Sequence, residues 1–305
     1  MRPERKRALT SHTKSEREIT YRTRGHGEGF IARLMSPSDL GEYLKPFVFL
    51  DVFTADAEIV RAFTSGGGMP LHPHSGIATV TVITEGFLRF NDQEAGMGEI
   101  AYGGVEWMRA GSGVWHGKEM TPGSESGFQG FQLWLALPPE LENGNPESRY
   151  IEAKDMRHIG PAYVIIGSYE NVQSPVPAPL GINYLLVTLK PGERWIYTPP
   201  KGHSIGWLAL AKGALETGDR ISSGEMVLFE NSEKRILLCS TGEENAVFVL
   251  GSAVPHPYSL HLGNYSVHTS EEALSIGEKR IVELGRRLKA LGGRYTESGT
   301  IPVFR

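Results

Sequence analysis

Two histidines at alternating positions of a predicted strand, His72 and His74, constrain this chain more than any other feature. They follow a glycine run at residues 66–68 and lead into alternating threonine and valine that ends at Glu85-Gly86. This alternation predicts a β-strand, in which residues two apart point to the same face. The two imidazoles can therefore reach one point in space, as two ligands of one metal ion must. The alternative is a structural role, which is the common one for a histidine in a strand.

A third histidine, His116, ends a second motif that begins at Glu106 and contains Gly111-Ser112-Gly113. If this segment forms a neighbouring strand of the same barrel, the His116 ring faces the first two. Three neutral imidazoles, joined by a carboxylate, form a site for a borderline metal such as Fe, Ni, Cu, Mn or Zn. The second half of the chain has histidines as well, but it has no HxH pair. We therefore expect no metal ion there.

The HPH pair, the strand that ends at Gly86 and the motif that ends at His116 together resemble the pirin family of the cupin superfamily. The similarity extends to residues 27–30, 46–51 and 132–138. The resemblance implies an all-β bicupin with two β-barrel (jelly-roll) domains, a C-terminal α-helix and one metal ion in the N-terminal barrel. It implies as metal ligands His72, His74, His116 and Glu119. Some family members are linked to quercetin dioxygenation and others to transcriptional co-regulation.

Three positions depart from the usual pirin pattern. Ser75 stands where pirins usually have arginine, and Ala78 stands where they usually have glutamate. The glutamate ligand usually follows the third histidine by two residues, whereas Glu119 follows His116 by three, which on a regular strand places them on opposite faces. A bulge at Gly117 would bring Glu119 back, since glycine tolerates the required dihedral angles. The alternative for Glu119 is a surface carboxylate paired with the lysine before it.

Length and turn chemistry divide the chain into segments. Its 305 residues exceed the size at which a single core usually stops growing, and the proline-rich stretch 138–146 is the best linker candidate. Short strands between glycine-rich turns predict a β-barrel on each side, and a capping box at residue 269 followed by apolar residues at helical spacing predicts a helix. The expected segments are a basic N-terminal segment (1–26), an N-terminal metal-binding cupin barrel (27–140), a linker region (141–160), a C-terminal metal-free cupin barrel (161–268) and a helix that packs on a barrel (269–293).

Charge and composition limit the partners. A net charge of −4 gives no bulk attraction to nucleic acid. Residues 1–24 hold eight Lys/Arg and three Asp/Glu, and such a basic arm is more often a solvated terminus than a binding element. The single cysteine, Cys239, excludes an internal disulfide bond, and the sequence has neither a secretory leader nor an apolar run of membrane-spanning length. We expect a soluble, cytoplasmic protein with no membrane partner.

Three classes of function remain open. The first is a metal-dependent dioxygenase, an oxidoreductase that resembles quercetin 2,3-dioxygenase and acts with O2 on a flavonol- or enediol-type small molecule. In it, Glu119 accepts the substrate proton. The second is a metal- or redox-dependent regulator that binds a protein partner, and the third is a metal-dependent isomerase or sugar-type cupin. We expect the first class, with one divalent metal ion per chain: Fe(II) first, and Ni, Mn, Cu, Co or Zn as alternatives.

Overall fold

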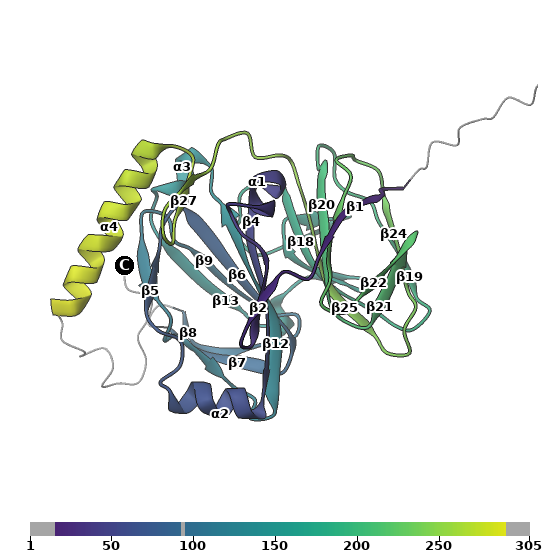
Figure 1. Ribbon diagram of the computed structural model, residues 1–305, viewed down its shortest axis with the longest axis horizontal. Helices are drawn as coiled ribbons and strands as arrows, with labels where there is room; N and C mark the ends of the chain where they lie inside the picture. Colours follow the sequence, from purple (N-terminus) through teal and green to yellow (C-terminus); the bar gives the residue numbers. More distant parts are fainter. Residues whose placement is uncertain (1–15, 93–94, 291–305) are drawn as a thin grey trace, which may run out of the picture.

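Two seven-stranded antiparallel sheets form the centre of the molecule (Figure 1). The computed structural model describes residues 16–92 and 95–290. The N-terminal sheet has the order β13 (Glu147–Ile151), β9 (Val105–Arg109), β6 (Ile77–Glu85), β12 (Gly127–Ala136), β4 (Phe47–Asp56), β3 (Ile31–Met35) and β2 (His26–Glu28). The C-terminal sheet has the order β1 (Ile19–Thr23), β23 (Met226–Phe229), β20 (Ile205–Lys212), β25 (Ala246–Ala253), β18 (Ile182–Leu189), β15 (Ala162–Ile166) and β14 (His158–Ile159).

Smaller sheets and short helices complete both halves. The small sheets of the N-terminal half are β11 (Met120–Pro122), β7 (Phe87–Asp92) and β8 (Gly96–Ala101), and the pair β10 (Val114–His116) and β5 (His72–His74). Those that follow in the chain are β19 (Arg194–Tyr197), β24 (Ile236–Ser240), β21 (Ala214–Thr217) and β22 (Asp219–Ser222), the pair β16 (Ser168–Tyr169) and β17 (Val172–Gln173), and the pair β26 (His261–Leu262) and β27 (Val267–His268). The helices are α1 (Leu40–Leu44), α2 (Ala57–Ser65), α3 (Pro139–Glu142), the 3₁₀ turn η1 (Ala153–Asp155) and α4 (Glu271–Ala290).

One apolar core joins the two large sheets. It contains Val80 and Leu133 from the N-terminal sheet and Leu186 from the C-terminal sheet, and the rings of Phe47 and Trp207 meet across it at 5.3 Å between centroids. Strand β6 is buried along most of its length because its valines face this core while its threonines face the other side of the sheet. The expected all-β class with a C-terminal helix is confirmed, and the paired sheets of each half fit the jelly-roll architecture.

The two ends of the described chain connect the halves. Strand β1 lies at the edge of the C-terminal sheet, where it pairs with β23 before the chain enters the N-terminal sheet. Helix α4 returns from the C-terminal half to pack against β5, β10 and β27 (Figure 1). The stretch expected as a linker contains β13, which pairs with β9 at the edge of the N-terminal sheet. The domain boundaries themselves stay a prediction, and residues 1–15 and 291–293 of the expected terminal segments lie outside the described residues.

Membrane crossing by a helix finds no support in the described residues, since none of their helices has the length and apolar character that a bilayer requires.

A buried carboxylate, Glu106, lies on β9 inside the N-terminal half. Its side chain accepts hydrogen bonds from the hydroxyl groups of Thr81, at 2.7 Å, and Thr79, at 3.5 Å, and the residue is only 1% exposed. Burial raises the pKa of Glu106 to about 7, although the Thr81 hydroxyl opposes this shift. Ionising a carboxyl group in such a place costs free energy. The free energy of unfolding of the metal-free protein should therefore depend on whether Glu106 is ionised.

We expect Glu106→Gln to stabilise the metal-free protein relative to wild type increasingly as pH rises. The folded-state pKa of about 7 lies above the ordinary 4.5, so the wild type carries no penalty below 4.5 and loses stability as pH rises through 7. Above pH 7, the free energy of unfolding of the variant should exceed that of the wild type by roughly 3 kcal/mol. Denaturant unfolding at acidic, neutral and alkaline pH measures it, with the exposed Glu85→Gln as control. A difference that stays constant with pH would contradict the assignment.

Candidate metal centre

Strands β5 and β10 bring the three predicted histidines together. They pair antiparallel, so that His116 lies opposite His72 while His74 lies opposite Val114. The ring centroids are 4.4 Å apart for His72 and His116, 4.9 Å for His72 and His74, and 5.1 Å for His74 and His116. One potential ligand atom of each ring lies within 4.8 Å of those of the other two. Among the described residues, these three side chains form a group that can hold a metal ion.

Each ring has its Nδ1 atom occupied by an oxygen acceptor. The distances from Nδ1 to oxygen are 2.9 Å for His72, 3.1 Å for His74 and 2.7 Å for His116. The acceptors are, in the same order, the carbonyl oxygens of Pro70 and Tyr265 and the carboxylate of Glu119. Carbonyl and carboxylate oxygens only accept, so each Nδ1 carries the hydrogen and each Nε2 offers its lone pair.

The remaining ring nitrogens fit a metal ion. The Nε2 atoms of His74 and His116 are buried and have no hydrogen-bond partner. A buried polar atom without a partner costs free energy, and such atoms usually have a partner that the protein itself does not supply. Metal-bound histidines typically donate their other ring N–H to a carboxylate or a carbonyl group, which is the arrangement found here. The donor set therefore suits a metal ion.

Burial keeps two of the rings in the uncharged form that binds metal. It lowers the pKa of His74 well below its ordinary value and lowers the pKa of His72 to about 4. Burial also disfavours the charged form of His116, but the adjacent Glu119 carboxylate outweighs it and raises the pKa of that ring. The same pairing holds the pKa of the Glu119 carboxyl below its usual range in spite of burial.

A bend after β10 places Glu119 against His116. Strand β10 ends at His116, and Gly117 takes a φ of +136°. A Cβ at Gly117 would lie 2.5 Å from the Pro70 carbonyl oxygen, so only glycine fits there without rearrangement. The bend returns the Glu119 carboxylate to His116 Nδ1 and to the Gly117 N–H, which donates to Oε2 at 2.8 Å. A glycine-dependent irregularity thus does occur where the sequence predicted a bulge.

Glu119 is neither exposed nor paired with Lys118. The residue is 2% exposed, and Lys118 Nζ instead donates to the Gly67 carbonyl oxygen. Both carboxylate oxygens of Glu119 are engaged on the Nδ1 side of His116, away from the Nε2 atom that would face a metal ion. The prediction that Glu119 is a fourth ligand therefore stays untested. The described geometry gives the side chain another task, the orientation of His116.

A small apolar cavity of about 110 Å³ borders Glu119 and Gly117. Its aromatic wall consists of Phe30, Phe53, Phe63 and Phe128. The polar side chains in the wall are Asp51, Thr81, Glu119, Thr121 and Gln132. The Thr81 hydroxyl donates to Glu106, so three buried carboxylates, Asp51, Glu106 and Glu119, lie at or immediately behind the cavity wall. The cavity can receive a small, largely apolar molecule next to Glu119 and Gly117, while none of the three histidines is among its lining residues.

Sequence reasoning missed two features of this site. Glu106 was overlooked as a buried carboxylate, although an acidic residue between Val105 and Trp107 in an apolar strand is itself a signal, because burying it is costly. The acceptor for His74 is the backbone carbonyl of Tyr265, 191 residues further along the chain. A carbonyl group leaves no mark in the sequence, so no motif could have revealed it.

Known proteins with similar sequences include pirins and proteins named for quercetin dioxygenase activity. Residues 31–135 match the Pirin family. A protein of Pseudomonas aeruginosa named "Putative quercetin 2,3-dioxygenase" is 28% identical over 257 residues, which cover 81% of this chain and 88% of that protein. A pirin-like protein of Caulobacter vibrioides is 37% identical over 136 residues, which cover 42% of this chain and 48% of that protein.

Solved structures share the fold over most of the chain. A quercetin 2,3-dioxygenase from Acinetobacter baumannii superimposes with a TM-score of 0.72 at 22% identity, over 92% of this chain and 99% of that one. A bacterial pirin from Escherichia coli in complex with nickel(II) superimposes with a TM-score of 0.56 at 16% identity, over 75% of this chain and 94% of that one. Residues 31–135 thus match the Pirin family in sequence, and over most of its length the chain has the fold of these solved structures.

Proposed function

We propose that this protein is a metal-dependent dioxygenase that acts with O2 on a flavonol- or enediol-type small molecule. The observation that carries the proposal is the set of three imidazoles with occupied Nδ1 atoms and converging ligand atoms. Glu119, which contacts His116, also lines a cavity with an aromatic wall. Relatives named for quercetin 2,3-dioxygenase activity support it, since one of them aligns over 81% of the chain.

We propose Fe(II) as the resident metal, with Ni, Mn, Cu, Co and Zn as alternatives. Neutral imidazoles suit several borderline divalent metals, so availability decides as much as geometry does. The nickel(II) complex of a bacterial pirin with the same fold supports a divalent ion in general. When bound, such an ion supplies Lewis-acid chemistry and a redox partner for O2.

The residues around the site would bind the metal ion, orient its ligands and accept the substrate proton. His72, His74 and His116 would hold the ion through Nε2, and Glu119 would keep the His116 ring in place. Glu119 also lines the cavity, and a carboxylate has more lone pairs than its present two donors occupy. We therefore assign it the acceptance of the substrate hydroxyl proton. To act as a fourth ligand, it would first have to leave both donors.

The aromatic lining of the cavity favours an aromatic substrate, and the small volume of the cavity means that part of its wall has to move when such a substrate binds. At about 110 Å³ it is smaller than the roughly 300 Å³ or more typical of ligand sites. A flavonol therefore requires part of the wall to move. Phe63 and Met69 come from α2 and from the loop that contains the glycine run, while most of the remaining wall comes from sheets. The regulatory alternative has no observation in its favour among residues 16–92 and 95–290.

Replacement of one ligand should abolish metal binding without unfolding the protein. We expect His74→Ala to lower metal affinity by at least about 100-fold, and Glu119→Gln to lower it by about tenfold, because only the orientation of His116 weakens. Metal analysis after dialysis, with circular dichroism for the fold, measures both. His203→Ala, which alters a buried histidine away from the cluster, is the control and should keep its metal. Full occupancy in His74→Ala would refute the ligand assignment.

Oxygen uptake tests the proposed activity directly. We expect Fe(II)-loaded protein to consume O2 when quercetin is added and to release a ring-opened product, whereas metal-stripped protein and His74→Ala do not. An oxygen electrode and mass spectrometry of the product measure this. Loaded protein that holds one ion per chain yet consumes no O2 with quercetin or a simple enediol would exclude the dioxygenase proposal.

A further inference from the structure

The C-terminal strands and helix cover the back of the metal-ligand strands. We call β26, β27 and α4, residues 261–290, the C-terminal clamp. Trp115 points away from the histidine cluster, and its Nε1 atom donates to the Ile281 carbonyl oxygen of α4 at 2.8 Å. A Cβ at Gly113 would lie 2.9 Å from the Ile281 side chain, so the helix lies close against β10. Strand β5 likewise contacts the clamp.

The clamp supplies an acceptor to a metal ligand. His74 Nδ1 lies 3.1 Å from the Tyr265 carbonyl oxygen, and this contact alone among the ring's described interactions selects the Nδ1–H form. The Nε2 atom of the same ring faces the cluster without a partner. Were the Tyr265 carbonyl displaced, the hydrogen could move to Nε2, and the lone pair that a metal ion needs would be lost.

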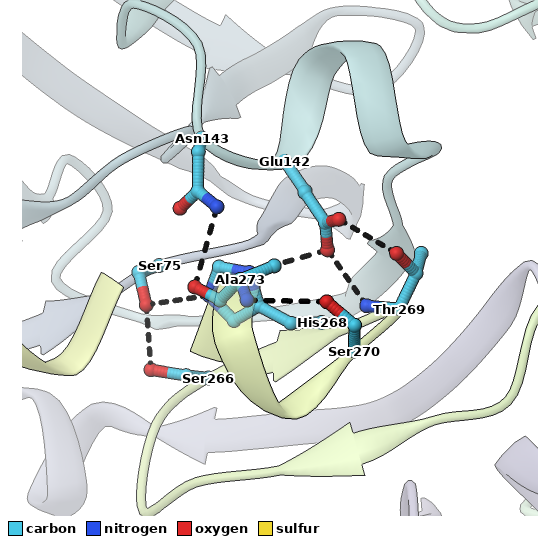
Figure 2. A network of polar contacts seen from close by, with 8 residues as sticks. All are labelled: Ser75, Glu142, Asn143, Ser266, His268, Thr269, Ser270 and Ala273. Carbon is cyan, nitrogen blue, oxygen red and sulfur yellow. Dashed lines mark hydrogen bonds and ion pairs between the residues drawn. The ribbon is translucent and has the colours of Figure 1, made fainter. Parts of the chain in front are cut away.

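A buried polar cluster fastens the clamp to the residue after His74 (Figure 2). Ser75 Oγ lies 2.8 Å from Ser266 Oγ and 3.0 Å from His268 Nε2. His268 Nδ1 lies 3.2 Å from Glu142 Oε2, and Glu142 also accepts hydrogen bonds from the Thr269 N–H and hydroxyl at 2.7 and 2.6 Å. The cluster thus joins the residue that follows β5 to α3 and to the clamp through their side chains.

This cluster has the residue types of a serine hydrolase triad but not its accessibility. Ser75 is 0% exposed, His268 1% and Glu142 2%. A Cβ at Gly277 of α4 would lie 2.5 Å from both Ser75 Oγ and His268 Nε2, so helix backbone occupies the space that a substrate would need. The cluster therefore serves attachment rather than nucleophilic catalysis.

We propose that the C-terminal clamp is a positioning element of the metal centre: the Ser75–His268–Glu142 cluster holds the Tyr265 carbonyl against His74 and fixes that ring with Nε2 free to bind metal. This inference rests on the metal site of the proposed function. It adds that residues near the end of the described chain control metal retention, although none of them is a ligand.

Two variants that loosen the cluster test the proposal. Ser75→Ala removes the hydroxyl that meets Ser266 and His268, and Glu142→Gln weakens the hold on His268 and Thr269 at a position remote in sequence from every ligand. We expect both to release Ni(II) to excess chelator at least about tenfold faster than wild type, in line with the effect of residues that orient metal ligands. If Glu142→Gln fails to fold, Ser75→Ala carries the test.

Ser252→Ala is the matched control. Ser252 is also a buried serine with two side-chain partners, Tyr197 at 2.6 Å and His203 at 2.9 Å, but it lies in the C-terminal sheet away from the metal strands. We expect its loss to lower stability without changing the Ni(II) release rate. If a general loss of stability caused the effect, Ni(II) release would be faster in all three variants. If the clamp positions His74, release is faster only in Ser75→Ala and Glu142→Gln.

A second readout separates failure of the clamp from failure of the proposed function. In metal-free full-length protein, ¹⁵N NMR of the histidine rings reports which nitrogen of His74 carries the hydrogen. We expect pure Nδ1–H in wild type and in Ser252→Ala, and a mixture of both forms in Ser75→Ala and Glu142→Gln. If both cluster variants keep the wild-type signal, or if Ser252→Ala changes it equally, the clamp proposal is overturned. This holds even if Ni(II) does not bind to the wild type.

Discussion

The pairing of β5 with β10 is the constraint on which this site depends. It sets His72 opposite His116 and brings three imidazoles together, with ring centroids 4.4 Å apart for that pair. Strands of three residues are too short to hold such an arrangement unaided. Two buried Nε2 atoms without partners add a cost on the order of 1–3 kcal/mol each. The surrounding fold must therefore stabilise a ligand set that is unfavourable until a metal ion satisfies it.

The support for the three rings comes from three different parts of the chain. His72 is held by the carbonyl of Pro70, two residues earlier, and His116 by Glu119, within the bend that Gly117 permits. Only His74 depends on a distant segment, through Tyr265. Local supports form as soon as their own segment folds, whereas the remote one requires the C-terminal clamp to be docked. The His74 ring is thus the ligand whose geometry reports on completion of the whole fold.

The sequence predicted what depends on local periodicity and on local chemistry. Alternation around His72 and His74 was enough to place both rings on one face, and helical spacing after residue 269 was enough to predict α4. A second motif that ends at His116 supplied the third histidine, and the family resemblance supplied the full ligand set with Glu119. Nothing in the sequence predicted that β1 would pair with β23 in the other half, because edge pairing between remote strands depends on how complete sheets stack. The role of a backbone carbonyl is equally invisible, since every residue has one.

The departures from the pirin pattern become intelligible as features of this fold. Arginine at position 75 would have to displace α4, because Gly277 already lies against the Ser75 hydroxyl. The serine and the clamp therefore form one unit, with His268 as a partner 193 residues away.

Ala78 is buried in the core that the two sheets share, where an ionised side chain would be costly. The buried carboxylate of Glu106 on the adjacent β9 lies on the other face of the sheet, with Thr79 and Thr81, so it does not take the place of a carboxylate at position 78. Comparison at a single position would count each change as a lost functional group. In three dimensions, however, Ser75 has partners elsewhere in the chain, so the competence of the metal centre has to be judged from the residues that surround its ligands as well as from the ligands themselves.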